Sequence, residues 1–334
     1  MTDRQYTFIQ RIAVIDKSGN KTHIAPDSVI SADLTEHANM NGTILILELN
    51  DPATEYRDNL KIRYGTVLEI TYGDVLNKNT ELTIDKFFVL ASPSEKQVLT
   101  LELIQLDCYN LKKPANQPQF FVDAEPSAIL KKLVGSVPVI VDCPAIKGTY
   151  HLNAGGNASR LIRKMARDYG CLAYYSRGKF YFVSTSKAIA KDSKITLEYG
   201  NNEAKFPIQR YKINDRLFMY ETILDKQFIR WETTAGMQKS INSGDDTNGT
   251  VVITAATEKA LTNQGKTIIP TVTVDTAGFG DFKAGLSCAL VLRINQAQKE
   301  LDETLKERQL IEFVTHHAKG NQYLCRLGLG VQND

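Results

Sequence analysis

The sequence predicts a mainly β protein of the α+β class, in which two antiparallel β-rich parts flank a small module with two helices. Three observations support this prediction. Apolar and polar residues alternate in many short runs on both sides of the middle of the chain, for example over residues 43–50. Between residues 157 and 169, apolar residues recur instead at helical spacing. A similar hairpin pattern also occurs near each end of the chain.

Composition and charge limit the classes of protein to be considered. The chain has 334 residues, 43% hydrophobic and 23% charged, which is ordinary for a folded protein of two or three domains. Its 40 basic and 38 acidic residues leave a net charge of +2, which argues against a large, general nucleic-acid surface. The start lacks a secretory signal pattern, and no run approaches the roughly 20 apolar residues of a membrane span. Five scattered cysteines without a C-x-x-C pair predict buried thiols.

The first part, residues 1–115, is expected to be antiparallel β. Glycine, proline and short polar stretches separate its apolar runs, and the last two runs form a hairpin around a proline-containing turn. The expected strands cover residues 6–15, 43–50, 66–72, 82–92 and 97–106.

The middle part, residues 116–192, is expected to be the α+β module. A Pro- and Gln-rich stretch leads into it. Its first helix covers residues 126–134, with Pro126 in the first turn, where the missing amide hydrogen is harmless, and with Gly135 at the end.

The second helix covers residues 158–169. Asn157 and Ser159 are its candidate N-caps, and Gly170 provides a C-terminal cap. The buried stripe consists of Leu161, Ile162, Met165, Ala166 and Tyr169. The opposite face is basic and carries Arg160, Arg163, Lys164 and Arg167. An aromatic hairpin follows over residues 171–183.

The last part, residues 193–334, returns to β structure. Turn residues again separate short apolar runs, and the polar stretch over residues 240–250 predicts a loop. The expected strands cover residues 195–199, 206–213, 217–224, 251–254, 268–274, 287–294, 310–315 and 323–329. Residues 296–308 have a helix-forming composition.

Two hairpins resemble each other. Residues 87–101 and 312–326 align without a gap and share a phenylalanine, a valine, a glutamine and a leucine at matching positions. Four identities over fifteen positions are compatible with duplication and also with chance.

Several runs together resemble the hub proteins of contractile phage tails. The helix is followed by Gly170-Cys171-Leu172-Ala173-Tyr174 and then by Phe180-Tyr181-Phe182-Val183. Earlier matches are Leu60-Lys61, Gly65, Val67, Ile70, Gly73, Asp107 and Leu111. Later matches are Phe313-Val314-Thr315-His316, Gly320 and Tyr323. The chain is therefore similar to the baseplate hub, the late-control protein D family and the hub half of type VI secretion spike proteins, although the likeness is patchy between about residues 225 and 285.

The resemblance implies a structural role without catalysis or cofactors. Two similar β-barrel-like tube domains per chain would let a homotrimer present six units and adapt the six-fold tail tube to the three-fold spike. Expected partners are the tail tube protein, a spike protein on a separate chain, and other baseplate proteins. The genome would pass through the lumen without specific binding. The protein would belong to the baseplate of the virion, assembled in the host cytoplasm, with no membrane involved in the mature fold.

Candidate sites are few. Arg160, Arg163, Lys164 and Arg167 form either a solvated face or a docking surface for an acidic neighbour. Trp231 is suited to an interface or to a core. His316 and His317 alternate on a strand and so cannot easily share a metal ion, which favours a rim or interface position. No phosphate-binding, dinucleotide, metalloprotease or serine-hydrolase motif occurs.

Two alternatives to the hub remain open from the residues. One is a tail-associated peptidoglycan hydrolase, although no paired acid and base is marked in the sequence. The other is a β-rich module that binds a receptor or carbohydrate.

Overall fold

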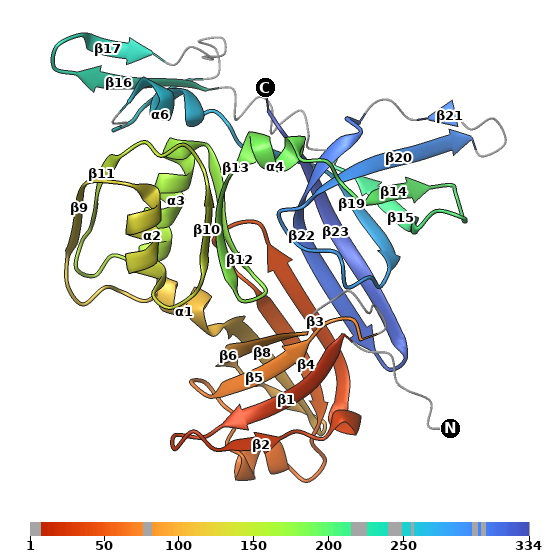
Figure 1. Ribbon diagram of the computed structural model, residues 1–334. Coiled ribbons are helices and arrows are strands. Elements are labelled where there is room, and N and C mark those ends of the chain that lie inside the picture. Colours follow the sequence, from red (N-terminus) through yellow and green to blue (C-terminus); the bar gives the residue numbers. More distant parts are fainter. Residues whose placement is uncertain are drawn as a thin grey trace.

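The structure is a computed structural model that describes residues 8–75, 82–214, 226–239, 249–254, 257–295, 300–301 and 305–333. Figure 1 shows its parts: a first β unit, an α+β module beside it, a barrel, and a small flap next to the end of the module. The mainly β prediction is confirmed.

The first β unit is an antiparallel sheet with the strand order β1-β5-β6-β8-β4-β3. Its strands are β1 (Ile9–Ile15), β2 (Lys21–His23), β3 (Val29–His37), β4 (Ile44–Asn50), β5 (Val67–Tyr72), β6 (Thr83–Ala91), β7 (Ser94–Glu95) and β8 (Val98–Gln105), with short helical turns η1 (Pro26–Ser28) and η2 (Glu55–Asn59). Alternation decides which side chains are buried: Leu45, Leu47 and Leu49 of β4 are buried, whereas Ile46 is exposed.

The α+β module has its own apolar core. It consists of β9 (Gln119–Ala124), α2 (Pro126–Val134), β10 (Val139–Asp142), β11 (Gly148–Leu152), α3 (Ala158–Tyr169), β12 (Cys171–Ser176), β13 (Lys179–Ser184) and α4 (Thr185–Ala190). Helix α1 (Leu106–Lys112), which lies within the residues expected to be β, adds Cys108 and Leu111 to the same core. Strands β10, β13 and β12 form one small sheet, and β9 and β11 form another. Ile129, Ile162, Met165 and Phe182 are fully buried between these elements.

The barrel closes on itself. Its strands are β14 (Thr196–Tyr199), β15 (Phe206–Ile213), β19 (Ile268–Ala277), β20 (Ser287–Asn295), β22 (Arg308–Lys319) and β23 (Gln322–Gln332), and a short β21 (Glu300–Leu301) pairs with β20. The pairing runs β22-β23-β19-β15-β14-β20 and returns to β22. Because β14 pairs in parallel with both β15 and β20, the expectation of a purely antiparallel barrel is wrong.

The flap is a small sheet with a short helix. It contains β16 (Gln227–Glu232), β17 (Gly236–Lys239), β18 (Thr250–Val252) and α6 (Glu258–Asn263). Helix α6 packs on α3, where Asn263 Nδ2 donates to the Asp168 carbonyl at 2.9 Å. Across the described ranges, every helix is too short or too polar to cross a membrane.

Strand β3 joins the first β unit to the barrel. It pairs with β4 on one side and with β22 on the other, in a register from Phe313↔His37 to Lys319↔Ser31. One contiguous apolar core lies beneath both β units. Within the described residues, the end strands β1 and β3 of the first unit do not pair with each other, so the observed arrangement is one closed barrel continued by an open sheet.

Helix expectations near the end of the chain were partly wrong. Of the stretch 296–308, Glu300–Leu301 forms strand β21 and Arg308 begins β22, while residues 296–299 and 302–304 lie outside the described residues. Local composition favours a helix there, but the free edge of β20 offers strand pairing to the return segment. The strand expected over residues 217–224 also lies outside the described residues.

Both segments of the repeated hairpin pattern form hairpins, in β6–β8 and in β22–β23. In their first strands, Val89 and Val314 occupy matching positions and both are fully buried. The similarity of these first strands therefore has a structural counterpart.

The second strands of the two hairpins are shifted by one residue. The matching valines pair with Leu103 in one hairpin and with Leu327 in the other, which are offset by one position in the gapless alignment. A slip of one residue exchanges the faces of a strand. Accordingly, Leu99 is buried whereas its aligned counterpart Leu324 is 38% exposed.

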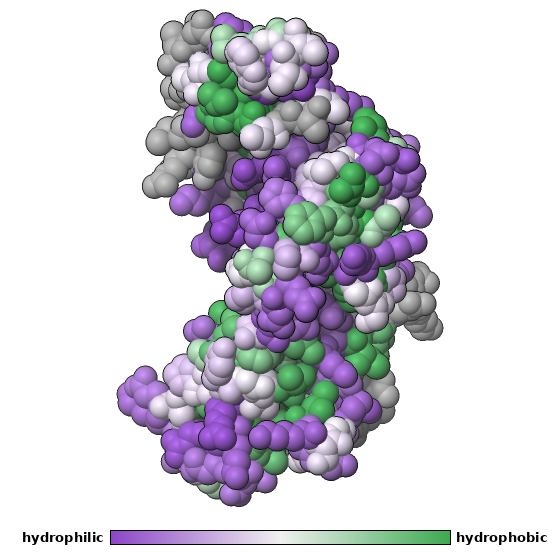
Figure 2. All heavy atoms as spheres, turned by 90° about the vertical axis from the view of Figure 1, so that its left-hand side faces the viewer, coloured by the Kyte–Doolittle hydropathy of each residue, from purple (hydrophilic) through white to green (hydrophobic). Residues whose placement is uncertain are grey.

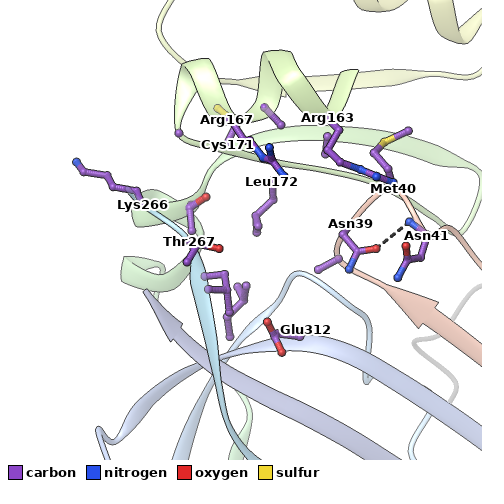
Figure 3. Close-up of a pocket in the computed structure, with 17 residues that line it drawn as sticks. Asn39, Met40, Asn41, Arg163, Arg167, Cys171, Leu172, Lys266, Thr267 and Glu312 are labelled. Carbon is purple, nitrogen blue, oxygen red and sulfur yellow. Dashed lines mark hydrogen bonds between the residues drawn. The ribbon is translucent and has the colours of Figure 1, made fainter. Parts of the chain in front are cut away.

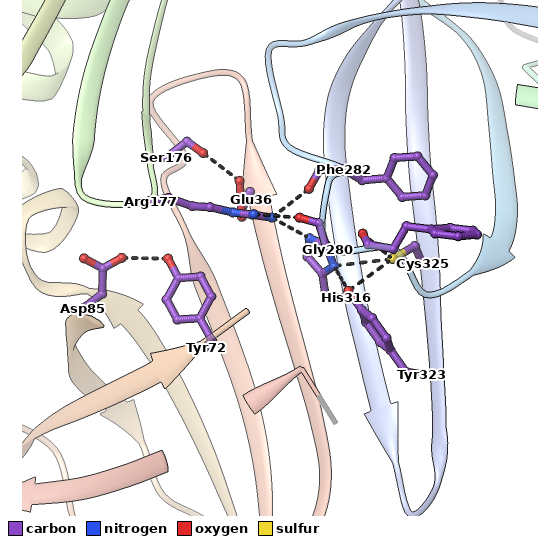
Figure 4. A network of polar contacts seen from close by, with 11 residues as sticks. Glu36, Tyr72, Asp85, Ser176, Arg177, Gly280, Phe282, His316, Tyr323 and Cys325 are labelled. Carbon is purple, nitrogen blue, oxygen red and sulfur yellow. Dashed lines mark hydrogen bonds and ion pairs between the residues drawn. The ribbon is translucent and has the colours of Figure 1, made fainter. Parts of the chain in front are cut away.

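The tip of the β12–β13 hairpin reaches between the first β unit and the barrel. Arg177 and Gly178 have φ values of 46° and 76°, as the two central residues of a type I′ turn require. An arginine is uncommon at positive φ, where glycine and asparagine are preferred. The turn directs the Arg177 side chain into the interior (Figure 4).

Arg177 contacts both neighbouring units, in an arrangement we call the Arg177 junction (Arg177, Ser176, Glu36, Gly280 and Phe282). Its Nε donates to Glu36 Oε1 of β3 at 2.9 Å, and Ser176 Oγ donates to Glu36 Oε2 at 2.8 Å. Its Nη1 and Nη2 donate to the carbonyls of Gly280 and Phe282 in the barrel, at 2.7 and 2.8 Å (Figure 4). One side chain thus connects the module, the first β unit and the barrel.

The Arg177 junction is a buried ion pair with satisfied partners. The side chains of Arg177 and Glu36 are 7% and 0% exposed. Burial alone would raise the pKa of Glu36, but the positive charge and hydrogen bonds of Arg177 outweigh it and hold that pKa below its usual range. Next to this pair, the hydroxyls of Tyr175 and Tyr72 donate to the Asp85 carboxyl at 2.5 and 2.7 Å, which links the module to the first β unit a second time.

Truncating the arginine is expected to destabilise the whole chain. In Arg177→Ala the Glu36 carboxylate loses its counter-ion inside the protein, and such losses cost about 3–5 kcal/mol. Urea unfolding followed by circular dichroism measures this change. Lys187→Ala removes the exposed Lys187–Asp142 pair and should leave the midpoint unchanged. Equal midpoints for the two variants would contradict a central role of the Arg177 junction.

Candidate functional site

Helix α3 displays a basic face because its ends and its apolar stripe are fixed by the sequence. Asn157 is the N-cap, and its side chain accepts a hydrogen bond from the Arg160 amide at 2.9 Å. Ser159 is not the cap: its hydroxyl donates to the Asn157 side chain. Gly170 ends the helix with φ 62°, a left-handed conformation. The buried stripe contains Leu161, Ile162, Met165 and Ala166, which leaves the basic side chains outside.

The four cations of α3 line a groove against the flap, which we call the α3 groove. Its volume is about 460 Å3. The lining residues are Arg160, Arg163, Lys164, Arg167, Asp168, Gln264, Val252, Ile253 and Thr254. In the part of the chain that the structure describes, none of the four cations forms an ion pair.

The carboxyl in the α3 groove, Asp168, is already engaged. Tyr150 Oη donates to one of its oxygens at 3.0 Å, and Gln264 Nε2 donates to the other at 2.8 Å. Burial raises the pKa of Asp168, which these hydrogen bonds oppose in part. The groove therefore carries a strong excess of positive charge.

A second groove of about 400 Å3 lies where α3, the β3–β4 loop and β22 meet, and we call it the junction groove (Figure 3). Arg163 and Arg167 reach it from α3, and Asn39 and Asn41 come from the loop. The Asn41 amide donates to the Asn39 side chain at 2.8 Å, which fixes the loop at this wall. The two arginines thus face two neighbouring hollows.

Glu312 of β22 lies at the opposite wall of the junction groove (Figure 3). Burial raises its pKa to about 7, from an ordinary value of about 4.3. Near neutral pH this carboxyl is thus partly protonated and compensates little of the charge of Arg163 and Arg167.

Trp231 lies on an exposed apolar face of the flap. It is 73% exposed and faces Met237 across the β16–β17 pair. Val252, on the neighbouring strand β18, is also 73% exposed and borders the α3 groove. Exposed apolar side chains on adjacent strands are typical of an interaction surface.

The two histidines occupy different environments. His316 is 1% exposed and lies inside the chain, so the expectation that it belongs to a rim or an intermolecular interface is wrong. It stacks on Phe8 with ring centres 4.0 Å apart, and its Nδ1 is 2.7 Å from Tyr323 Oη. Burial and the nearby charge of Arg177 lower its pKa to about 3. His317 is partly exposed and pairs with Asp33 of β3.

Sequence reasoning missed Arg177 and Glu36. The available signal was the dipeptide Arg177-Gly178 in a two-residue turn, because arginine at such a position indicates that its side chain has a specific partner. Sequence reasoning also placed Glu312 only as part of a strand. Within the described residues, no cluster of three or more His, Cys, Asp or Glu side chains is arranged to hold a metal ion.

The fold matches solved structures, although no protein family and no curated protein matches the sequence. A tail protein from Neisseria meningitidis is 12% identical, with a TM-score of 0.63 over 98% of this chain and 97% of that one. The 43 kDa tail protein of prophage MuSo2 from Shewanella oneidensis is 12% identical, with a TM-score of 0.59 over 96% and 97%.

A third match lies outside phages. It is a component of the type VI secretion system of E. coli, described as structurally similar to the T4 tail proteins gp27 and gp5. This protein is 9% identical, with a TM-score of 0.50 over 92% of this chain and 76% of that one. The chain therefore has the fold found in phage tail proteins and in this secretion-system component.

Neutralising the carboxyl in the junction groove should stabilise the chain at alkaline pH. The folded-state pKa of Glu312 is about 7, above its unfolded value, so ionisation weakens the folded state as pH rises from about 4.3 to 7. Glu312→Gln removes this effect. Its melting temperature should exceed that of the unaltered protein at pH 8 and equal it at pH 4.5. A constant difference at both pH values would contradict the raised pKa.

Proposed function

We propose that this chain is a structural baseplate hub protein of a contractile phage tail or a related injection machine. The observation that carries the proposal is the match to two phage tail proteins over almost the full length of all three chains. The type VI secretion component, which is itself described as similar to tail proteins, supports the same class. The protein would act by assembly rather than by catalysis.

In this proposal, residues 1–115 and 193–334 are the two tube domains, and residues 116–192 hold neighbouring subunits in place. Three chains would present six β units around one axis and so adapt a six-fold tail tube to a three-fold spike. The first β unit and the barrel share a sheet and a core, which suits a rigid wall segment. The first β unit is an open sheet in the single chain, and its end strands would complete their pairing only in the assembled ring.

The proposed partners are a second and third copy of the chain, the tail tube protein, a separate spike protein and other baseplate proteins. The ring would lie in the virion baseplate after assembly in the host cytoplasm, and the genome would pass through its lumen. A peptidoglycan hydrolase or a carbohydrate-binding module is less well supported, because the matched structures are phage tail proteins and a secretion-system component. Zymography on cell-wall material should show no clearing.

The purified chain is expected to form a trimer, alone or with its tube and spike partners. Light scattering should give three times the 37.3 kDa mass of the chain, and electron microscopy should show rings with a central opening. A monomer that stays monomeric with both partners, or a closed dimer, would overturn the hub proposal.

The exposed face of the flap is proposed to contact a neighbouring subunit. Replacing Trp231 and Met237 with serine should lower the trimer fraction at a given concentration without changing the unfolding midpoint, because both side chains are exposed in the single chain. Ile84→Ser, at a 63% exposed position on β6 outside the module and the flap, is the matched control. Sedimentation velocity over a concentration series distinguishes the variants. If both shift equally, the flap has no specific role.

A further inference from the structure

One wall of the α3 groove is formed by the flap and carries no charged side chain. Val252, Ile253 and Thr254 line it consecutively. Val252 is the last residue of β18, and Ile253, just beyond it, still donates its amide to the Ile229 carbonyl of β16. Successive side chains of an extended chain point to opposite faces, so three neighbours in a row indicate that this segment presents its edge to the groove. Among the described strands, β18 pairs with β16 alone, which leaves this edge without a partner strand.

The edge of β18 presents both backbone donors and backbone acceptors to the groove. In a parallel pair, alternate residues direct their N–H and C=O groups to the partner, as the Ile253 amide does to the Ile229 carbonyl at 2.8 Å. The residues between them direct these groups outward. Such an edge is a template for an added strand.

We propose that the α3 groove binds an extended, acidic polypeptide segment of a partner protein, which adds a strand to β18 and directs its carboxylates to the cations of α3. Arg160, Arg163, Lys164 and Arg167 supply the charge complement, and the β18 backbone supplies the main-chain hydrogen bonds. Val252, 73% exposed at the entrance, supplies apolar contact for alternate side chains of the segment.

The strand edge favours a polypeptide over a nucleic acid. Phosphates would pair with the four cations, but the outward C=O groups of β18 would repel them, whereas a peptide backbone satisfies donors and acceptors together. On the side of the molecule shown in Figure 2, hydrophilic residues cover most of the middle, with smaller apolar groups between them.

The proposed acidic segment would belong to another protein of the tail assembly. Only this origin of the segment rests on the proposed function. Binding at the α3 groove can be measured on the single chain, whereas the hub proposal is tested by ring formation. A chain that forms rings but binds no acidic peptide would overturn this inference alone. A chain that binds the peptide but forms no ring would overturn the hub proposal alone.

The test uses the full chain and a fluorescent peptide of about eight alternating glutamate and valine residues, a length that spans a strand of ordinary size. Fluorescence anisotropy at low salt measures its affinity. The double variant Arg160→Glu, Lys164→Glu should bind at least about tenfold more weakly, since two attractive charges become repulsive. The control variant Lys17→Glu, Lys131→Glu reverses two exposed charges elsewhere and should bind as the unaltered chain does. Circular dichroism melting verifies that both variants fold.

Three further probes distinguish strand addition by an acidic peptide from binding by charge alone and from binding of a nucleic acid. A peptide with an N-methyl group at every position keeps its charge but cannot donate along either edge, and it should lose at least about tenfold in affinity. Equal binding of this peptide would overturn strand addition. A lysine–valine peptide should not bind. Tighter binding of an oligothymidine with the same number of charges would overturn the assignment to a polypeptide.

Discussion

The arrangement of the chain depends on one buried cation. The Arg177 guanidinium binds a carboxylate of β3 and two carbonyls of the barrel. This single group therefore fixes the relative positions of the module, the first β unit and the barrel. A planar group with five donors suits this task, because each donor has a fixed direction and a shifted neighbour would leave a buried group unsatisfied. The apolar core beneath both β units holds them together, but apolar contacts alone tolerate sliding. The polar junction specifies one alignment.

Local features of this chain were readable from the sequence, and long-range pairing was not. The ends of α3 follow from Asn157 and Gly170, and its stripe follows from the 3.6-residue period. The helix ends and the buried stripe each depend on residues that lie within one helical turn of them. The parallel pairing of β14, in contrast, depends on which strands the chain brings beside it from nearly a hundred residues away. The two similar hairpins have turns of different length, so their second strands are shifted by one residue and bury opposite faces. The four matching residues of the two hairpins do not reveal this shift.

The candidate site shows the same limit. The basic face of α3 was visible as a pattern, because its residues share one helix. The groove exists only because β18 and α6 return to α3 after some ninety residues, and Asn263 anchors them to its last turn. His316 illustrates the opposite case: a histidine pair on a strand suggested a rim, yet the alternation that separates the two rings buries His316 and leaves His317 partly exposed. The fold is shared with tail proteins that are only 12% identical to this chain.

The continuous sheet through β3 and β22 has a mechanical consequence. Force applied along these antiparallel strands shears the whole row of hydrogen bonds at once, from Phe313↔His37 to Lys319↔Ser31, instead of opening them one after another. A joint loaded in shear resists sudden pulling far better than one that unzips. The first β unit and the barrel would therefore resist tension along these strands as a single body.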